Sequence, residues 1–109
     1  MLESEIQSEI INYLQILENQ GKLFFHRMNN IPAVNKINGV TKFRRLPPGA
    51  KRGVPDIIII KNGKFIGIEV KTKTGIQSTY QKEVEKNIKK QGAEYYVVRS
   101  LADVQSILK

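Results

Sequence analysis

Cysteine and tryptophan are absent from this sequence, histidine occurs once, and no long apolar run is present. Without cysteine the chain can form neither disulfides nor thiolate metal sites, and nothing points to secretion. A single histidine excludes any site that needs two. No segment approaches the roughly 18–20 apolar residues that cross a bilayer, and the acidic N-terminus is unlike a signal peptide. We therefore expect a cytoplasmic protein with no membrane partner.

The remaining composition suits one domain over residues 1–109. With 40% hydrophobic residues the chain can bury a core of modest size. The charged fraction of 26% is too ordinary for wholesale disorder. We find no internal repeat and no low-complexity segment, so a second domain is not expected.

The net charge of +8 is distributed unevenly along the chain. Residues 1–18 contain four acids and no base, whereas residues 19–55 contain eight bases and no acid. A stretch this long without a carboxylate is a candidate binding surface for a polyanion such as nucleic acid. A merely solubilising surface explains the composition equally well, so charge alone does not decide between them.

Hydrophobic periodicity predicts an α/β fold. Apolar residues spaced near 3.6 indicate helices, a continuous β-branched run indicates a strand covered on both faces, and Asn62-Gly63 indicates a hairpin turn. Residues 28–53 form a long basic connection that can include a hairpin around Asn38-Gly39. The predicted elements are a helix over 2–19, strands over 23–27, 54–60 and 64–72, a helix over 79–91 after the Ser78 cap, a strand over 94–98, and a helix over 101–108.

Three charged residues interrupt the two apolar strands joined by Asn62-Gly63. Asp56 lies at the head of the first strand, and Glu69 and Lys71 lie near the end of the second. Residues i and i+2 share a sheet face, and a two-residue turn places Asp56 opposite Glu69. This register puts two carboxylates and one ammonium within about 5–7 Å of each other.

Two adjacent carboxylates repel each other, and a divalent cation relieves that repulsion. Hard oxygen ligands suit Mg²⁺ or Mn²⁺, which keep several waters and accept phosphate oxygens. The lysine can orient a metal-bound water, help to deprotonate it, or neutralise charge on a reacting phosphate. The set suits phosphodiester hydrolysis. The alternative is an ion cluster that only solvates the strand end.

Five segments along the chain are informative as a set: Glu3-Ser4-Glu5-Ile6-Gln7, Gly53-Val54-Pro55-Asp56-Ile57, Gly67-Ile68-Glu69-Val70-Lys71-Thr72, Ser78 to Lys82, and Tyr96 to Ser100. In their order and residue types they resemble the VRR-NUC family, including its stand-alone virus-type members, within the PD-(D/E)XK nucleases. The resemblance implies a restriction-endonuclease-like αβββαβ core with a mixed central sheet flanked by helices, which agrees with the order of elements predicted above. The family's V-R-R triplet corresponds to Val98-Arg99-Ser100, and we assign Arg99 to structure or to support of the site.

The resemblance implies a metal site on the hairpin strands. Asp56, Glu69 and the backbone carbonyl of Val70 would be ligands of Mg²⁺ or Mn²⁺. Lys71 would act on the nucleophilic water. No organic cofactor is implied.

The resemblance also implies contributions from two helices. A glutamate of the first helix would complete the site: Glu3 fits the family spacing to Gln7, with Glu5 and then Glu9 as alternatives. Gln81, in the first turn of the second helix, would contact the site or the substrate, although an ordinary exposed glutamine is the alternative.

DNA is the partner implied by the resemblance and by the basic connection. Phosphate contacts of this kind orient DNA without reading its sequence. The family resemblance and the small size favour a homodimer that cleaves four-way junctions in repair or recombination, in the host cytoplasm if the protein is viral. The alternatives are a flap, end or restriction-type nuclease and a non-catalytic DNA-binding module. The candidate contacts are Lys42, Arg44, Arg45, Lys51, Arg52, Ser78 and Lys82.

Overall fold

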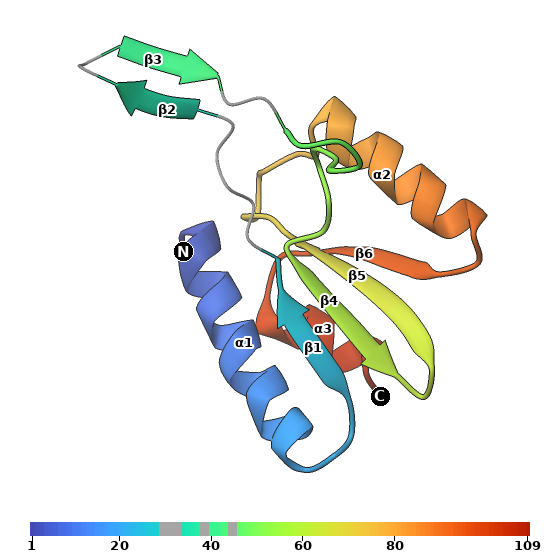
Figure 1. The fold of residues 1–109 in the computed structure, drawn as a ribbon. Helices are drawn as coiled ribbons and strands as arrows, with labels where there is room; N and C mark the ends of the chain where they lie inside the picture. Colours follow the sequence, from blue (N-terminus) through green and yellow to red (C-terminus); the bar gives the residue numbers. More distant parts are fainter. Residues whose placement is uncertain (29–33, 38–39, 44–45) are drawn as a thin grey trace.

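The structure, a computed structural model, describes residues 1–28 and 46–109 in full and residues 34–37 and 40–43 as backbone. Three helices and six strands follow one another in the described residues (Figure 1). Their order is α1 (Glu3–Asn19), β1 (Phe24–Arg27), β2 (Val34–Ile37), β3 (Val40–Phe43), β4 (Ile57–Lys61), β5 (Lys64–Val70), α2 (Thr79–Lys90), β6 (Glu94–Val98) and α3 (Leu101–Ile107).

The main sheet has the strand order β1-β4-β5-β6. β1 and β5 run antiparallel to β4, while β6 runs parallel to β5, so the sheet is mixed as predicted. The β4–β5 register pairs Ile57 with Ile68 and Lys61 with Lys64. This is the register expected from Asn62-Gly63, where positive φ angles of 53° and 76° form the turn.

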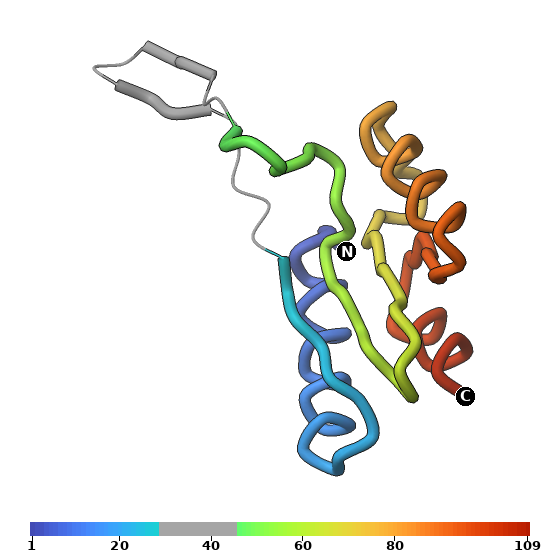
Figure 2. Tube along the Cα trace, turned by 45° about the vertical axis from the view of Figure 1, so that its right-hand side comes forward, coloured from blue at the N-terminus to red at the C-terminus, as the bar shows by residue number. Residues whose placement is uncertain are grey.

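Helices α1 and α3 cover one face of the sheet, and the hydrophobic core lies between them and that face. Alternate residues of the central strands point toward it, because successive strand side chains project to opposite faces. Helix α1 runs alongside β1 in both views (Figure 1 and Figure 2), and it also contacts β5 and α3. The most deeply buried core side chains are Ile10, Leu14, Ile57, Ile59, Ile68, Val70, Val98 and Val104.

The opposite face is covered over only part of its width. Helix α2 packs on β6, and Gly67, Glu69 and Tyr95 are buried on this side of the sheet. Farther across, Ile58 is half-buried and Ile60 is 41% exposed. The prediction that this strand is covered on both faces is therefore wrong at Ile60 and only partly right at Ile58, because no described helix extends over β4 and β1 on this side.

Most element boundaries agree with the predictions to within one or two residues. The strand predicted over 54–60 begins later, at Ile57, so Asp56 lies in a bend directly before it. β2 and β3 pair antiparallel, as a hairpin in the basic connection requires, and its Asn38-Gly39 turn lies outside the described residues. No helix among the described residues is long and apolar enough to cross a membrane.

Candidate active site

Glu69 is the buried charged residue at the centre of the candidate site. It is the penultimate residue of β5, and its side chain is 1% exposed. Its Oε2 accepts a 2.9 Å hydrogen bond from Gln81 Nε2. Its Oε1 is buried and has no hydrogen-bond partner within the described part of the chain. A buried carboxylate oxygen without a partner is costly, so a ligand is expected to supply what is missing.

Backbone groups hold Asp56 at the open end of the β4–β5 hairpin, opposite its turn. Its Oδ2 accepts a 2.8 Å hydrogen bond from the amide of Val70, and its own carbonyl accepts one from Met28 N at 2.8 Å. The preceding Pro55 is buried over Gly67, where an added Cβ would come within 2.8 Å of the proline Cγ. The close approach of Pro55 to Gly67 helps to fix the strand entry, and with it Asp56.

The environment of Glu69 favours its protonated form. Its pKa is raised to about 9, first because burial removes the carboxylate from water, and then because a hydrogen bond with Asp56 and the negative charge of Asp56 both favour the protonated carboxyl. The Lys71 ammonium acts in the opposite direction, and the negative charge of Glu3 raises the pKa further. The charges of Asp56, Lys71 and Glu3 thus all act on the Glu69 carboxyl.

The first-helix glutamates differ in their surroundings. Glu3 begins α1, and its charge acts on Glu69. Glu5 Oε1 instead accepts a 3.1 Å hydrogen bond from Leu2 N, so that carboxylate caps its own helix. Glu9 is exposed one turn farther along. These surroundings favour Glu3 as the glutamate that faces the site, and its role as a ligand stays a prediction.

Gln81 connects α2 to the site through a capping box with Ser78. The Ser78 hydroxyl accepts from Gln81 N at 3.1 Å, and Gln81 Oε1 accepts from Ser78 N at 2.8 Å. The side-chain oxygen of Gln81 is thus used by the helix cap, and its Nε2 is directed to Glu69. The exposed-glutamine alternative does not fit these contacts, because Gln81 is half-buried and bonded at both ends.

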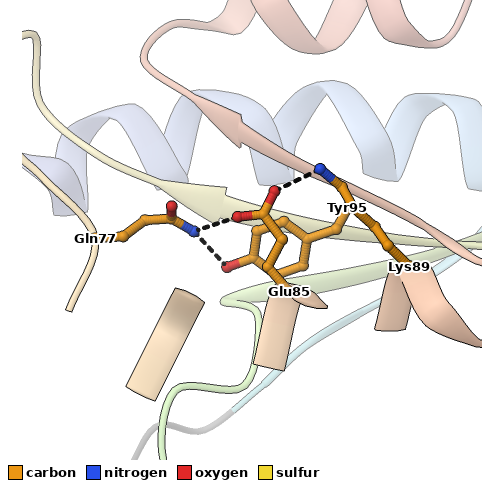
Figure 3. Close-up of polar contacts among 4 residues, drawn as sticks. All are labelled: Gln77, Glu85, Lys89 and Tyr95. Atoms are coloured by element: carbon orange, nitrogen blue, oxygen red, sulfur yellow. Dashed lines mark hydrogen bonds and ion pairs between the residues drawn. The ribbon is translucent and has the colours of Figure 1, made fainter. Parts of the chain in front are cut away.

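A polar network fastens α2 to β6 behind this contact. Gln77 Nε2 donates to Glu85 Oε1 at 3.0 Å and to the Tyr95 hydroxyl at 3.4 Å, and Glu85 pairs with Lys89 at 2.7 Å (Figure 3). Tyr95 is 2% exposed and packs against Gly67. The network sets the position of the helix from which Gln81 reaches Glu69.

Arg99 supports the turn that follows Lys71. Its Nη1 donates to the carbonyl oxygens of Thr72 at 2.6 Å and Gly75 at 2.7 Å, while its backbone amide donates to Asp103 Oδ2 at 2.8 Å. Lys71 itself is held through its amide, which donates to Val98 O at 2.9 Å. Arg99 therefore ties the start of α3 to the loop after Lys71, which favours the structural assignment made from the sequence.

The donor set fits a hard divalent cation that keeps part of its water shell. In the described ranges no three histidine, cysteine, aspartate or glutamate side chains form a metal site by themselves. Two carboxylates, one with an unpartnered buried oxygen, form the small donor set from which Mg²⁺ is held in proteins, the other positions being filled by water and phosphate.

The predicted DNA contacts are only partly within the described residues. Arg44 and Arg45 lie outside them, and of Lys42 only the backbone in β3 is described. Lys51, Arg52 and Lys82 are exposed. Ser78 is also exposed, and its hydroxyl is engaged in capping α2.

A mixed sheet flanked by helices, with two acids and a lysine gathered at one end, defines a restriction-endonuclease-like α/β fold. Two solved structures share it across nearly the whole chain. A structure described as "VRR_NUC domain" has a TM-score of 0.64 at 17% sequence identity and covers 99% of this chain and 96% of its own. A "VRR_NUC domain protein" has a TM-score of 0.60 at 21% identity, with 99% and 85% covered.

No protein-family model and no curated protein matches the sequence. The likeness to solved structures establishes the fold, which is that of VRR_NUC domains. The fold class predicted from the order of elements is therefore confirmed, and so is the resemblance to VRR-NUC domains at the level of fold.

Two positioning contacts were not predicted from the sequence. Gly53 has a φ of 80°, and a Cβ there would lie 2.5 Å from the backbone carbon of Tyr80, so the basic connection touches the start of α2. The Gln77–Tyr95 contact joins residues eighteen positions apart. The glycine directly before Val54-Pro55-Asp56 could have indicated the close approach of Gly53 to α2. No local sequence pattern indicates the contact between Gln77 and Tyr95.

Proposed function

We propose that residues 1–109 form one metal-dependent DNA endonuclease domain that hydrolyses phosphodiester bonds. The observation that carries this proposal is the Glu69 carboxyl: it is buried, one oxygen has no partner, and the charges of Asp56 and Lys71 act on it. Most buried polar atoms in a purely structural cluster find a partner, so the unpartnered oxygen favours a site that a ligand completes. The shared fold of structures described as VRR_NUC domains supports the same conclusion.

The chain's residues have separate tasks in this proposal. Asp56, Glu69 and the Val70 carbonyl would hold Mg²⁺ or Mn²⁺, with Glu3 completing the set through water, because three acidic side chains do not meet at one point in the described residues. When bound, the cation supplies the Lewis acidity that lowers the pKa of a bound water and neutralises phosphate charge. Gln81 holds Glu69 Oε2 and thereby leaves Oε1 free for a ligand.

Lys71 provides the positive charge beside the carboxylates. Its ammonium lowers the pKa of Glu69, which favours the ionised carboxyl that a cation needs. The same charge can orient the attacking water and stabilise the negative charge that develops on the phosphate. Arg99 keeps the loop after Lys71 in place through its bonds to the carbonyls of Thr72, Lys73 and Gly75.

We infer that the substrate is branched DNA and that the enzyme acts as a homodimer, as Holliday-junction resolvases do. A two-fold dimer would present two sites for paired cuts and a larger basic surface. Support comes from an apolar pair on the sheet face that no described helix covers. Phe24 pairs with Ile60 there, and these residues are 53% and 41% exposed.

The test is cleavage of four-way junction, flap, splayed-arm and linear duplex DNA with Mg²⁺ or Mn²⁺. We expect cleavage of the junction, its loss in Lys71→Ala, and its retention in Lys73→Ala, which removes an exposed lysine two residues away. Unchanged cleavage by Lys71→Ala refutes the site. Preference for flaps or linear DNA identifies one of the other nuclease classes, and DNA binding without any cleavage identifies a binding module.

A further inference from the structure

A pocket of about 470 Å³ lies between the end of the basic connection and the first turns of α2. Its apolar wall is formed by Leu46, Tyr80 and Val84. Lys51 and Arg52 line it from the connection, and Glu83 lines it from α2. The volume is within the range of sites that hold a small ligand or one part of a larger one.

Tyr80 presents an aromatic ring at this pocket. Its side chain is 56% exposed although it lies at the start of a helix, and the Arg52 guanidinium carbon is 5.6 Å from the ring centroid. An exposed aromatic ring next to an arginine is the combination on which unpaired nucleobases stack, because every base has a π-face and every flanking phosphate a charge.

The pocket adjoins the candidate active site through the backbone. Gly53 follows Arg52 directly and touches the backbone of Tyr80 and Gln81, and Gln81 donates to Glu69. Tyr80, which lines the pocket, therefore directly precedes the residue that bonds Glu69. The close packing of Gly53 on α2 also fixes the pocket wall relative to the site.

We propose that this pocket receives an unpaired nucleobase of the DNA strand bound at the candidate active site. The base lies against Tyr80 and Val84, and its flanking phosphate meets Lys51 and Arg52 at the rim. Glu83 disfavours a phosphate inside the pocket and offers an acceptor to an exocyclic amine of the base. This inference rests on the proposed function, and it adds a contact to a base that is unpaired at or next to the branch point.

The experiment compares binding to three DNAs in EDTA at one fixed ionic strength. The first is a duplex with a single unpaired 2-aminopurine, the second has an abasic residue at that position, and the third is fully paired. The variants are Tyr80→Ala, Tyr80→Phe and Arg52→Ala, with Lys90→Ala as the control for charge at the other end of α2. Far-UV circular dichroism verifies that each variant is folded.

We expect Tyr80→Ala to weaken binding of the unpaired-base DNA by about 5- to 150-fold, as for loss of one stacked base, and to change binding of the paired duplex by less than about twofold. Tyr80→Phe retains the affinity and the quenching of 2-aminopurine fluorescence, because the ring is kept. Wild-type protein should bind the abasic DNA more weakly than the unpaired-base DNA by a similar factor. Arg52→Ala weakens binding more than Lys90→Ala does.

Equal affinity of wild-type protein for the unpaired-base and abasic DNAs overturns the proposal, and this comparison holds even if Tyr80→Ala does not fold. Equal loss on all three DNAs also overturns it. Because binding is measured without metal, absence of cleavage in every substrate would refute the nuclease assignment and leave the base pocket standing. Cleavage that is insensitive to Tyr80 would refute the pocket alone.

Discussion

Replacing Glu69 by glutamine should stabilise the metal-free protein and change how its stability depends on pH. The carboxyl is 1% exposed, and Asp56 lies beside it, so ionisation at this position opposes folding. Glutamine has nearly the same shape and keeps an oxygen that can accept the bond from Gln81 Nε2. The substitution removes the titration while it preserves the packing.

The expected size follows from the pKa of Glu69, which the fold raises from 4.5 to about 9. Between these values the folded state holds a proton that the unfolded state has released. The stability that this protonated Glu69 carboxyl contributes is therefore fully present below pH 4.5, and it is lost as the pH rises through 9. Each pH unit within this window changes the free energy of unfolding by about 1.4 kcal/mol per proton.

Urea unfolding in EDTA, followed by circular dichroism at pH 5.5 and pH 7.5, measures this effect. The stability of Glu69→Gln relative to wild-type should rise by about 2–3 kcal/mol between the two pH values, because only the wild-type carboxyl titrates. Taking the difference between proteins removes the titration of groups that they share. Glu9→Gln, at an exposed position of α1, is the matched control and should show a difference that is flat with pH.

A flat difference for Glu69→Gln as well would refute the reasoning, since it would mean that Glu69 is ionised in the folded protein without a cation. A difference of the opposite sign would mean that the folded state prefers the carboxylate. In that case Glu69 would be satisfied by the protein, and the argument that a ligand completes it would fail.

Three further predictions concern the surroundings of the site. Mn²⁺ affinity, measured by isothermal titration calorimetry, should increase by up to about tenfold per pH unit from pH 6 to pH 8, because binding displaces the proton of Glu69; a pH-independent affinity contradicts this. Gly53→Ala should destabilise the fold by about 1–3 kcal/mol more than Gly49→Ala in thermal unfolding, because both glycines have positive φ and only Gly53 touches another segment; equal losses would remove the close-approach argument. Arg99→Ala should lower kcat about tenfold or more with little change in KM, because the loop after Lys71 loses its support. Arg99→Lys should restore part of kcat. A change confined to KM would contradict the role of Arg99 in positioning Lys71.

Two features that position the site, the β4–β5 turn and the start of α2, were predictable because their interactions lie between residues close in the sequence. Asn62-Gly63 forms a tight turn in which both residues have positive φ, so the register of β4 against β5 follows from two residues. Ser78 and Gln81 satisfy each other's backbone amides within four residues, so the start of α2 could be predicted as well. These are short-range interactions, and their partners are visible in one window of sequence.

The covering of the strands was not predictable in the same way. The Ile57–Ile60 run has the composition of a strand buried on both faces, yet Ile60 is 41% exposed. A β-branched run reports the preference of each side chain for a strand. Which helix lies over it depends on the path of the chain elsewhere, and here α2 packs on β6.

By itself, then, the sequence determined the three helices and the strands of the main sheet, their order, the β4–β5 register, and the acids and lysine at the open end of that strand pair. The tertiary structure alone decided that Gln81 holds one oxygen of Glu69 and leaves the other without a partner, and that Arg99 braces the loop after Lys71. It also decided that Gly53 brings Arg52 to the ring of Tyr80. The physical reason is the sequence separation of the partners. The backbone groups of turns and helix caps bond to neighbours in the chain, whereas burial and hydrogen bonding at the site depend on segments that only folding brings together.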